Sequence, residues 1–185
     1  MITDDFSQSI AIGESMPAFE LLGTDGCHYG PADFADKSLM VLVFTCNHCP
    51  YVLGSDQRLE AVVERFGSDR IAWVGICAND AASYPADSYP RMQERAASLP
   101  YTYLHDPSQA VARAFGAQVT PEFYVFGRQG DDWLLVYHGG IDDSPRDARQ
   151  ATDPQLAPAL EALLVGEAPA RPTTPVQGCS IKWLR

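Results

Sequence analysis

The stretch that most constrains the fold is a strand-like run that leads into two closely spaced cysteines and then into a helix. Residues 39–45 (LMVLVFT) are apolar and rich in β-branched side chains, as expected of a strand covered on both faces. Beyond Cys49, apolar side chains recur at the spacing of one helix face: Leu59, Val62, Val63 and Phe66. A strand that passes directly into a helix favours a layered α/β domain.

The same alternation continues along the chain. Residues 71–77 (IAWVGIC) predict a second buried strand, and a Pro-punctuated stretch then leads into a helix through residues 92–99. The later predicted elements are a strand at 101–105, a short helix through 111–115 capped by Asp106 or Ser108 and ended by Gly116, a hairpin of strands 122–126 and 133–138, and a last helix at 156–164. We expect an α/β domain with a mixed central sheet and helices on both faces, and irregular chain at 139–153 and from Ala168.

Composition excludes several functional classes. The 185 residues are 46% hydrophobic and 20% charged, which is ordinary for one globular domain, and the net charge is −11. A negative field repels phosphate backbones, so we expect no nucleic-acid partner. The start, MITDDFSQSI, lacks a basic segment followed by an apolar one, and no run reaches the roughly 18 apolar residues of a membrane span. We therefore expect a cytoplasmic protein without membrane association.

The two cysteines form a C-x-x-C motif, Cys46-Asn47-His48-Cys49, followed by Pro50. At the start of a helix this spacing brings both sulfurs within bonding distance. The helix dipole and a protonated His48 would both stabilise a thiolate at Cys46. Pro50 fits the first helical turn, where a missing N–H costs nothing. Five scattered cysteines do not form a secreted disulfide framework, so the pair indicates dithiol redox chemistry.

Thiol–disulfide exchange requires one attacking sulfur and one resolving sulfur. We expect Cys46 to attack a substrate disulfide and Cys49 to resolve the mixed disulfide. Metal binding is the competing interpretation, with Cys46, His48 and Cys49 joined by one distant ligand. A non-catalytic metal-binding module would instead use the two cysteines with a distant histidine, for which His105 and His138 are the candidates. No second C-x-x-C exists to complete a structural zinc site, and no haem-type C-x-x-C-H is present.

Several motifs together resemble the thioredoxin-like superfamily, specifically its redoxin group related to the alkyl hydroperoxide reductase/thiol-specific antioxidant and TlpA-like proteins. The similarity covers most of the chain, and the ending resembles the tail of a CNHCP-bearing branch of thioredoxin-family proteins. The matching segments are 13–21 (GESMPAFEL) with Asp25-Gly26, 41–52 (VLVFTCNHCPYV), 105–116, 119–126 (VTPEFYVF) and 178–183 (GCSIKW).

This resemblance implies a thioredoxin-like fold over residues 1–185, with a core at about 13–166, an N-terminal extension and a C-terminal tail at 167–185. It also implies that Pro121 is a cis-proline facing the dithiol, with Thr120 presenting its backbone to a substrate. Many thioredoxins have a buried acid on the strand before the cysteines, which residues 39–45 lack. Glu122 or a water is the expected substitute in proton transfer.

The resemblance further implies a thiol–disulfide oxidoreductase that serves cell redox homeostasis. Its partners would be protein or small-molecule disulfides and thiols, with a reductant such as thioredoxin or glutathione, and it would need no cofactor or resident metal. Substrate selection would lie in the loop at 83–89 and at Thr120. The physiological substrate, the direction of electron flow and the oligomeric state do not follow from these residues.

A peroxiredoxin-like thiol peroxidase with antioxidant activity is the alternative enzyme. Its motif, P-x-x-x-T-x-x-C, places threonine and proline at fixed positions before the reactive cysteine. Counting back from Cys46 or from Cys49 reaches neither residue, and Thr45 lies nearby at the wrong spacing. A fast peroxidase is therefore not expected, although any exposed low-pKa thiolate can be oxidised to a sulfenic acid.

The remaining cysteines carry weaker predictions. Cys77 ends an apolar strand and is expected to be a buried small hydrophobe, whereas Cys27 lies in a turn-rich surface segment. Cys179 precedes an apolar Ile-Lys-Trp sequence. A mobile tail would carry its sulfur back to the dithiol, while a permanently docked tail would act as an edge strand or anchor. Asp142 and Asp143 follow two glycines and are expected to cap or turn the chain.

Overall fold

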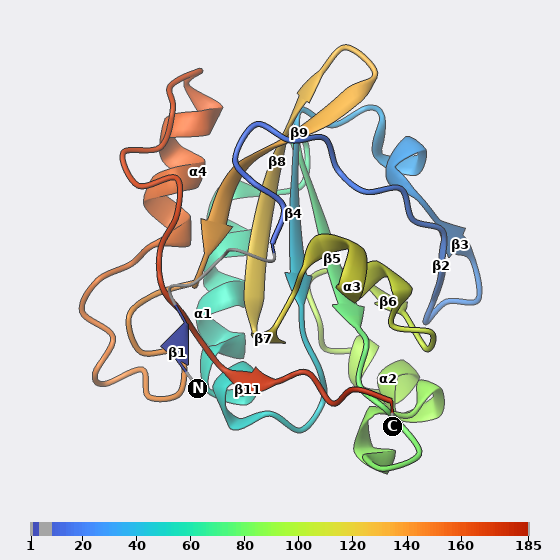
Figure 1. Ribbon diagram of the computed structural model, residues 1–185. Helices are drawn as coiled ribbons and strands as arrows, with labels where there is room; N and C mark the ends of the chain where they lie inside the picture. Colours follow the sequence, from blue (N-terminus) through green and yellow to red (C-terminus); the bar gives the residue numbers. More distant parts are fainter. Residues whose placement is uncertain (1, 4–8, 185) are drawn as a thin grey trace.

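A seven-stranded mixed sheet, in the order β3-β2-β6-β5-β4-β8-β9, organises the protein (Figure 1). The computed structural model describes residues 2–3 and 9–184, so most of the acidic start, where we expect no targeting segment, lies outside the described residues. The strands of this sheet are β2 (Leu21–Gly23), β3 (His28–Tyr29), β4 (Leu39–Phe44), β5 (Ile71–Cys77), β6 (Thr102–His105), β8 (Glu122–Gln129) and β9 (Asp132–Gly139).

The centre of the sheet is formed by the two runs predicted to be buried strands. Strand β4 pairs in parallel with β5 and antiparallel with β8, and every residue of β4 and β5 is buried. Continuous apolar runs of this kind are typical of strands covered on both faces. The β8–β9 hairpin is also confirmed, and Gly130 takes a left-handed conformation (φ 61°) in its turn.

Helices cover both faces of the sheet, as predicted. Helices α1 (Pro50–Phe66) and α4 (Leu156–Leu164) pack on one face, and α3 (Ala110–Phe115) packs on the other. Helix α2 (Tyr89–Ala96) and the short 3-10 helix η2 (Pro85–Asp87) lie near the end of the sheet where α1 begins, and another 3-10 helix, η1 (Pro31–Phe34), follows β3. In the described chain, no helix is long and apolar enough to span a membrane.

Two local expectations need correction. Helix α2 begins at Tyr89 rather than at 92, with Ser88 as its N-cap and a proline in its first turn. The N-cap of α3 is Gln109, which has a left-handed backbone. Asp106 and Ser108 still accept hydrogen bonds from first-turn amides of α3. Gly116 ends the helix in the left-handed conformation, as predicted.

The two ends of the chain contribute small strands that the sequence pattern does not reveal. In the N-terminal extension, β2 pairs antiparallel with both β3 and β6. In the C-terminal tail, β10 (Val176–Gln177) pairs with β1 (Ile2–Thr3), and β11 (Cys179–Ser180) pairs antiparallel with β7 (Val119–Thr120). The tail thus docks as an edge strand, one of its two expected arrangements.

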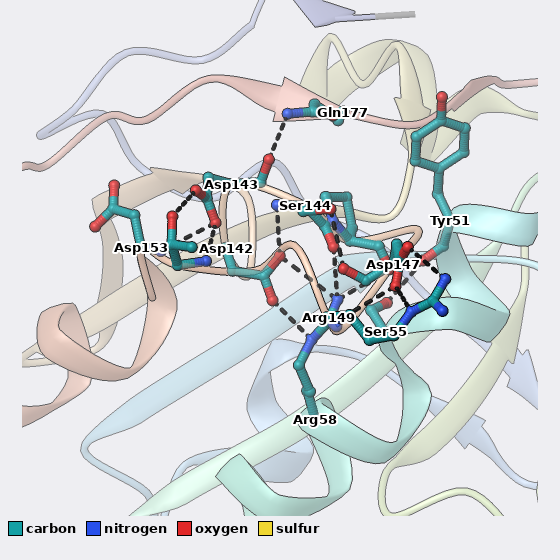
Figure 2. Close-up of polar contacts among 12 residues, drawn as sticks. Tyr51, Ser55, Arg58, Asp142, Asp143, Ser144, Asp147, Arg149, Asp153 and Gln177 are labelled. Atoms are coloured by element: carbon teal, nitrogen blue, oxygen red, sulfur yellow. Dashed lines mark hydrogen bonds and ion pairs between the residues drawn. The ribbon is translucent and has the colours of Figure 1, made fainter.

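The irregular segment 139–153 is held against α1 by polar contacts (Figure 2). Arg58 of α1 forms an ion pair with Asp142 (2.7 Å) and donates to the carbonyl of Ser144 (3.0 Å). Asp142 accepts a hydrogen bond from the Ser144 amide two residues on (2.9 Å), as expected of an acid in a turn, whereas Asp143 accepts from the amide and the hydroxyl of Thr152 and so joins distant parts of the segment. A Cβ on Gly54 would lie 2.4 Å from the Arg146 carbonyl, so this loop can approach α1 only because residue 54 is glycine.

Candidate dithiol site

The cysteine pair lies where β4 passes into α1. Strand β4 ends at Phe44, Cys49 is the N-cap of α1, and Pro50 is its first residue. Cys46 and Cys49 are both fully buried, with 0% of their surface exposed. They pack in a small cluster with apolar neighbours from α1, β5, β6 and α2: Val52, Cys77, Tyr103 and Met92. The strand therefore delivers two thiols to a closed site at the helix N-terminus.

The segment before β8 closes the other side of the pair. The Thr120–Pro121 peptide bond is cis, as the resemblance implies. The Thr120 hydroxyl lies 3.6 Å from the Cys46 sulfur, and the Cys49 sulfur, when it carries the proton, donates to the Thr120 carbonyl at 3.2 Å. Thr120 thus contacts both sulfurs, and Pro121, which has no N–H, offers them no competing donor.

The ionisation of the two thiols is coupled. The hydrogen bond between them lowers the pKa of Cys49 to about 4 and raises the pKa of Cys46 well above its ordinary range. The amide of Val52, in the first turn of α1, further favours a thiolate on Cys49, whereas the carboxylate of Asp87 disfavours one on Cys46. The sequence places the thiolate on Cys46; the geometry favours Cys49, because Cys49 and not Cys46 is the N-cap.

Asp87 is the functional residue that sequence reasoning missed. It is fully buried, and its carboxylate accepts hydrogen bonds from the Asn47 amide and the Asn79 side chain, each at 2.7 Å. The Nδ1 atom of His48 lies 2.7 Å from the same carboxylate. Asp87 therefore fixes the middle of the C-x-x-C loop. In the sequence it appears only as a turn acid before Ser-Tyr-Pro, within the loop predicted to select substrates.

Neighbouring rings complete the wall around Asn47 and His48. The Tyr103 hydroxyl donates to the Asn47 side chain at 3.0 Å, and Tyr84 stacks on His48 with ring centroids 5.3 Å apart. Thr45 is buried, its amide donates to Ile76, and its side chain faces Tyr101. Asn47 and His48 thus line the site as predicted, whereas Thr45 contributes to packing behind it.

Glu122 is the first residue of β8, and its carboxylate contacts the segment just before the cis-proline and two neighbouring side chains. Its carboxylate accepts hydrogen bonds from the amides of Gln118 (2.8 Å) and Val119 (3.0 Å) and from the Tyr124 hydroxyl (2.9 Å). The His138 ring nitrogen lies 2.7 Å from the same group, and both side chains are 1% exposed. Glu122 therefore shapes the loop that carries Thr120, and Asp87 is the buried acid beside the dithiol.

One cysteine of the pair also belongs to a group of three residues that could bind a metal ion. The ligand atoms of Cys46, His48 and Asp87 all lie within 4.8 Å of one another. The distant histidines considered from the sequence are engaged elsewhere, because His105 stacks on Tyr89 and His138 contacts Glu122. Any metal at this site would thus be held by Asp87 in place of a distant histidine.

The three other cysteines differ sharply in position. Cys77 is fully buried on β5 and Cys27 is exposed, as predicted for both. Cys179 is partly exposed on β11 and packs against the cluster that contains Cys46 and Cys49. A third thiol therefore lies beside the pair.

A mixed sheet with helices on both faces, a dithiol at the N-terminus of α1 and an opposing cis-proline define a protein with the thioredoxin-like fold. Residues 11–151 match the sequence profile of the Redoxin family, which is three quarters of the chain. The chain belongs to the Redoxin family. No curated protein matches the sequence.

Solved structures support the same grouping. An uncharacterized conserved protein from Geobacillus kaustophilus is 34% identical, with a TM-score of 0.88 over 100% of this chain and 96% of that one. A peroxidoxin, BcpB, from Mycobacterium tuberculosis is 19% identical (TM-score 0.55, 68% of this chain and 82% of that one). A thiol:disulfide interchange protein, DsbE, from Chlorobium tepidum is 20% identical (TM-score 0.55, 69% and 85%). The last two share the fold.

Proposed function

We propose that this protein is a thiol–disulfide oxidoreductase that exchanges electrons through the Cys46–Cys49 pair. The observation that carries the proposal is the hydrogen-bonded dithiol, which lies at a helix N-terminus and contacts Thr120 through both sulfurs. A thiolate is the attacking species in disulfide exchange, and the hydrogen bond between the two sulfurs allows the pair to hold one negative charge that proton transfer can place on Cys46. The DsbE neighbour is named as a thiol:disulfide interchange protein, which fits the same chemistry.

In the proposed cycle Cys46 attacks and Cys49 resolves. The proton shared by the pair moves to Cys49 as the Cys46 sulfur attacks a substrate disulfide, and a mixed disulfide forms while the substrate's second sulfur leaves as a thiolate. That thiolate takes up the proton of Cys49, which then attacks Cys46 and releases the second substrate sulfur as a thiolate, and a proton from water converts this thiolate to a thiol. The substrate is reduced to two thiols as the pair is oxidised to a disulfide. A thiol reductant such as thioredoxin or glutathione would restore the pair.

We assign the orientation of the site and of the substrate to the residues around the two sulfurs. We assign the orientation of the C-x-x-C loop to Asp87 through Asn47 and His48, because all three are joined within 2.7 Å contacts. The backbone of Thr120 would align the substrate. These are positioning roles, since the sulfurs alone react. A cytoplasmic protein of this kind would contribute to cell redox homeostasis.

Trapping of a mixed disulfide tests the proposal and the order of the two sulfurs. With a small aromatic disulfide as substrate, Cys49→Ser should accumulate a stable adduct on Cys46, because the resolving thiol is missing. Cys46→Ser should form no such adduct at a comparable rate, and Cys27→Ser serves as the matched control with the pair intact. Intact-protein and peptide mass spectrometry provide the readout. Adduct on Cys49 in Cys46→Ser, with none in Cys49→Ser, would reverse the two roles, and no adduct in either would refute the proposal.

Divalent-metal binding is a second candidate, favoured by the cluster of Cys46, His48 and Asp87. A thiolate, an imidazole and a carboxylate together suit zinc. Zinc added to the reduced protein would displace the thiol protons, so binding should release acid and protect Cys46 from alkylation. Titration calorimetry in two buffers of different ionisation enthalpy measures that release. Binding that survives in Asp87→Asn would exclude this site, and protein that binds no zinc would exclude the function.

A further inference from the structure

The C-terminal tail occupies the backbone edge beside the dithiol. Strand β11 pairs with β7 so that Cys179 lies opposite Thr120, and the Ile181 amide donates to the Gln118 carbonyl at 2.9 Å. In Figure 1 the red tail crosses the end of the sheet at which β7 lies. The Thr120 carbonyl is the group to which Cys49 donates. The tail is thus paired with the very residue that touches both sulfurs.

Close approach at this point depends on Gly178. A Cβ at this position would lie 2.3 Å from the Thr120 carbonyl oxygen and 2.7 Å from its carbon, which no side chain tolerates without a backbone shift. Glycine here allows the two backbones to meet. The sequence Gly178-Cys179 therefore brings a thiol against the cis-proline segment.

The tail is anchored on both sides of Cys179. Before it, the Gln177 side chain donates to the Asp143 carbonyl at 2.7 Å (Figure 2). After it, Ile181 is 2% exposed in the main core. The Lys182 amide donates to Asn79, and its carbonyl accepts from Gln109, each at 2.8 Å. These contacts fix the backbone on both sides of Cys179, so its sulfur stays beside the pair without movement of the tail.

The three thiols differ in access to solvent. Cys46 and Cys49 are 0% exposed, whereas Cys179 is partly exposed and packs against the cluster that contains them. The Cys179 thiol interacts with the Cys49 sulfur and favours its ionised form, while partial burial raises the pKa of Cys179 to about 11. A reductant should therefore reach a bond that ends on the partly exposed Cys179 faster than a bond between the two buried sulfurs.

We propose that Cys179 is a third redox thiol, which exchanges with the Cys46–Cys49 disulfide and presents an accessible sulfur to the reductant; this rests on the proposed function. Cys179 loses its proton and attacks the Cys49 sulfur. The Cys49–Cys179 bond forms as the Cys46–Cys49 bond breaks, and Cys46 leaves as a thiolate that takes up the proton. No electrons are gained or lost in this step. A thiol reductant then attacks Cys179 and expels Cys49, and a second reductant thiol releases Cys179.

The test is disulfide mapping after oxidation of the Cys46→Ser variant with diamide. The relay predicts an intramolecular Cys49–Cys179 bond, found by peptide mass spectrometry. Adding Gly178→Ala should abolish that bond without altering either thiol, because the tail backbone is displaced. Separate Cys49 and Cys179 thiols in Cys46→Ser, or a bond from Cys179 to a second molecule, would overturn the relay.

A second measurement separates this relay from the proposed function. Cys179→Ser should still form the Cys46–Cys49 bond with glutathione disulfide, but its reduction by glutathione should be slower than in the natural protein. Cys27→Ser removes an exposed thiol away from the site and should leave that rate unchanged. Equal rates in Cys179→Ser and the natural protein would refute the relay alone. A Cys46–Cys49 bond that forms in neither protein would refute the proposed function itself.

Discussion

At the scale of single residues, the site depends on one buried carboxylate. Asp87 joins Asn47, His48 and Asn79, and its negative charge raises the pKa of Cys46. A buried carboxylate with three donors is well satisfied, so its removal leaves donors without acceptors. Asp87 therefore acts both on the stability of the loop and on the charge of the dithiol.

Replacement of Asp87 by Asn tests both effects. The amide retains one acceptor oxygen, so its NH₂ group would face the Asn79 and His48 donors, and stability should fall by about 1–3 kcal/mol. Because a nearby negative charge opposes ionisation, its loss should lower the pKa of Cys46, and its thiolate should persist to lower pH. The ¹³Cβ shift of Cys46 followed against pH in a Cys49→Ser background, with urea unfolding alongside, measures the two quantities.

The control for this substitution is Asp56→Asn, which removes a carboxylate that pairs with Arg95 at 2.7 Å instead of with the C-x-x-C loop. It should leave the Cys46 titration unchanged. A Cys46 pKa that stays the same in Asp87→Asn, or that rises, would contradict the electrostatic role given to Asp87.

At the scale of elements, a helix or strand could be predicted when it was long enough to show a clear apolar period. Strand β5 and the end of α1 match their predicted bounds, because a long run of one period leaves little choice of structure. Strands β7, β10 and β11 have two residues each and carry no periodic signal. Their existence depends on pairing between distant segments, which only the folded chain provides.

The same distinction between local patterns and distant contacts separates the site residues that could be predicted from those that could not. The sequence predicts the C-x-x-C motif at 46–49 because the dithiol is a local pattern. It predicts the role of Pro121 because that residue lies in a segment that resembles a known family. Asp87 was missed because it reaches the motif from about 40 residues away, through η2. The sequence predicts a thiolate on Cys46 from the helix dipole and a protonated His48, whereas the N-cap of α1 is Cys49. Contacts across the fold therefore set the chemistry within the motif.

At the scale of the whole molecule, segments from distant parts of the chain enclose the dithiol. The sheet delivers the dithiol on β4 and the cis-proline before β8, and the tail returns from α4 to pair with β7. The loop 139–153 joins this arrangement through Asp143 and Gln177 (Figure 2). Segments from the middle and the end of the sequence thus surround two buried sulfurs, and the N-terminal extension widens the far side of the sheet.

The most direct test of this account is a redox titration of the natural protein in glutathione buffers, with disulfide mapping at each ratio. We predict one two-electron oxidation that forms the Cys46–Cys49 bond or its exchange product, Cys49–Cys179, while Cys77 stays a thiol because burial raises its pKa to about 12. If Cys46 and Cys49 remain thiols across the whole range, or if oxidation joins neither of these pairs, the account of the protein as a dithiol oxidoreductase is wrong.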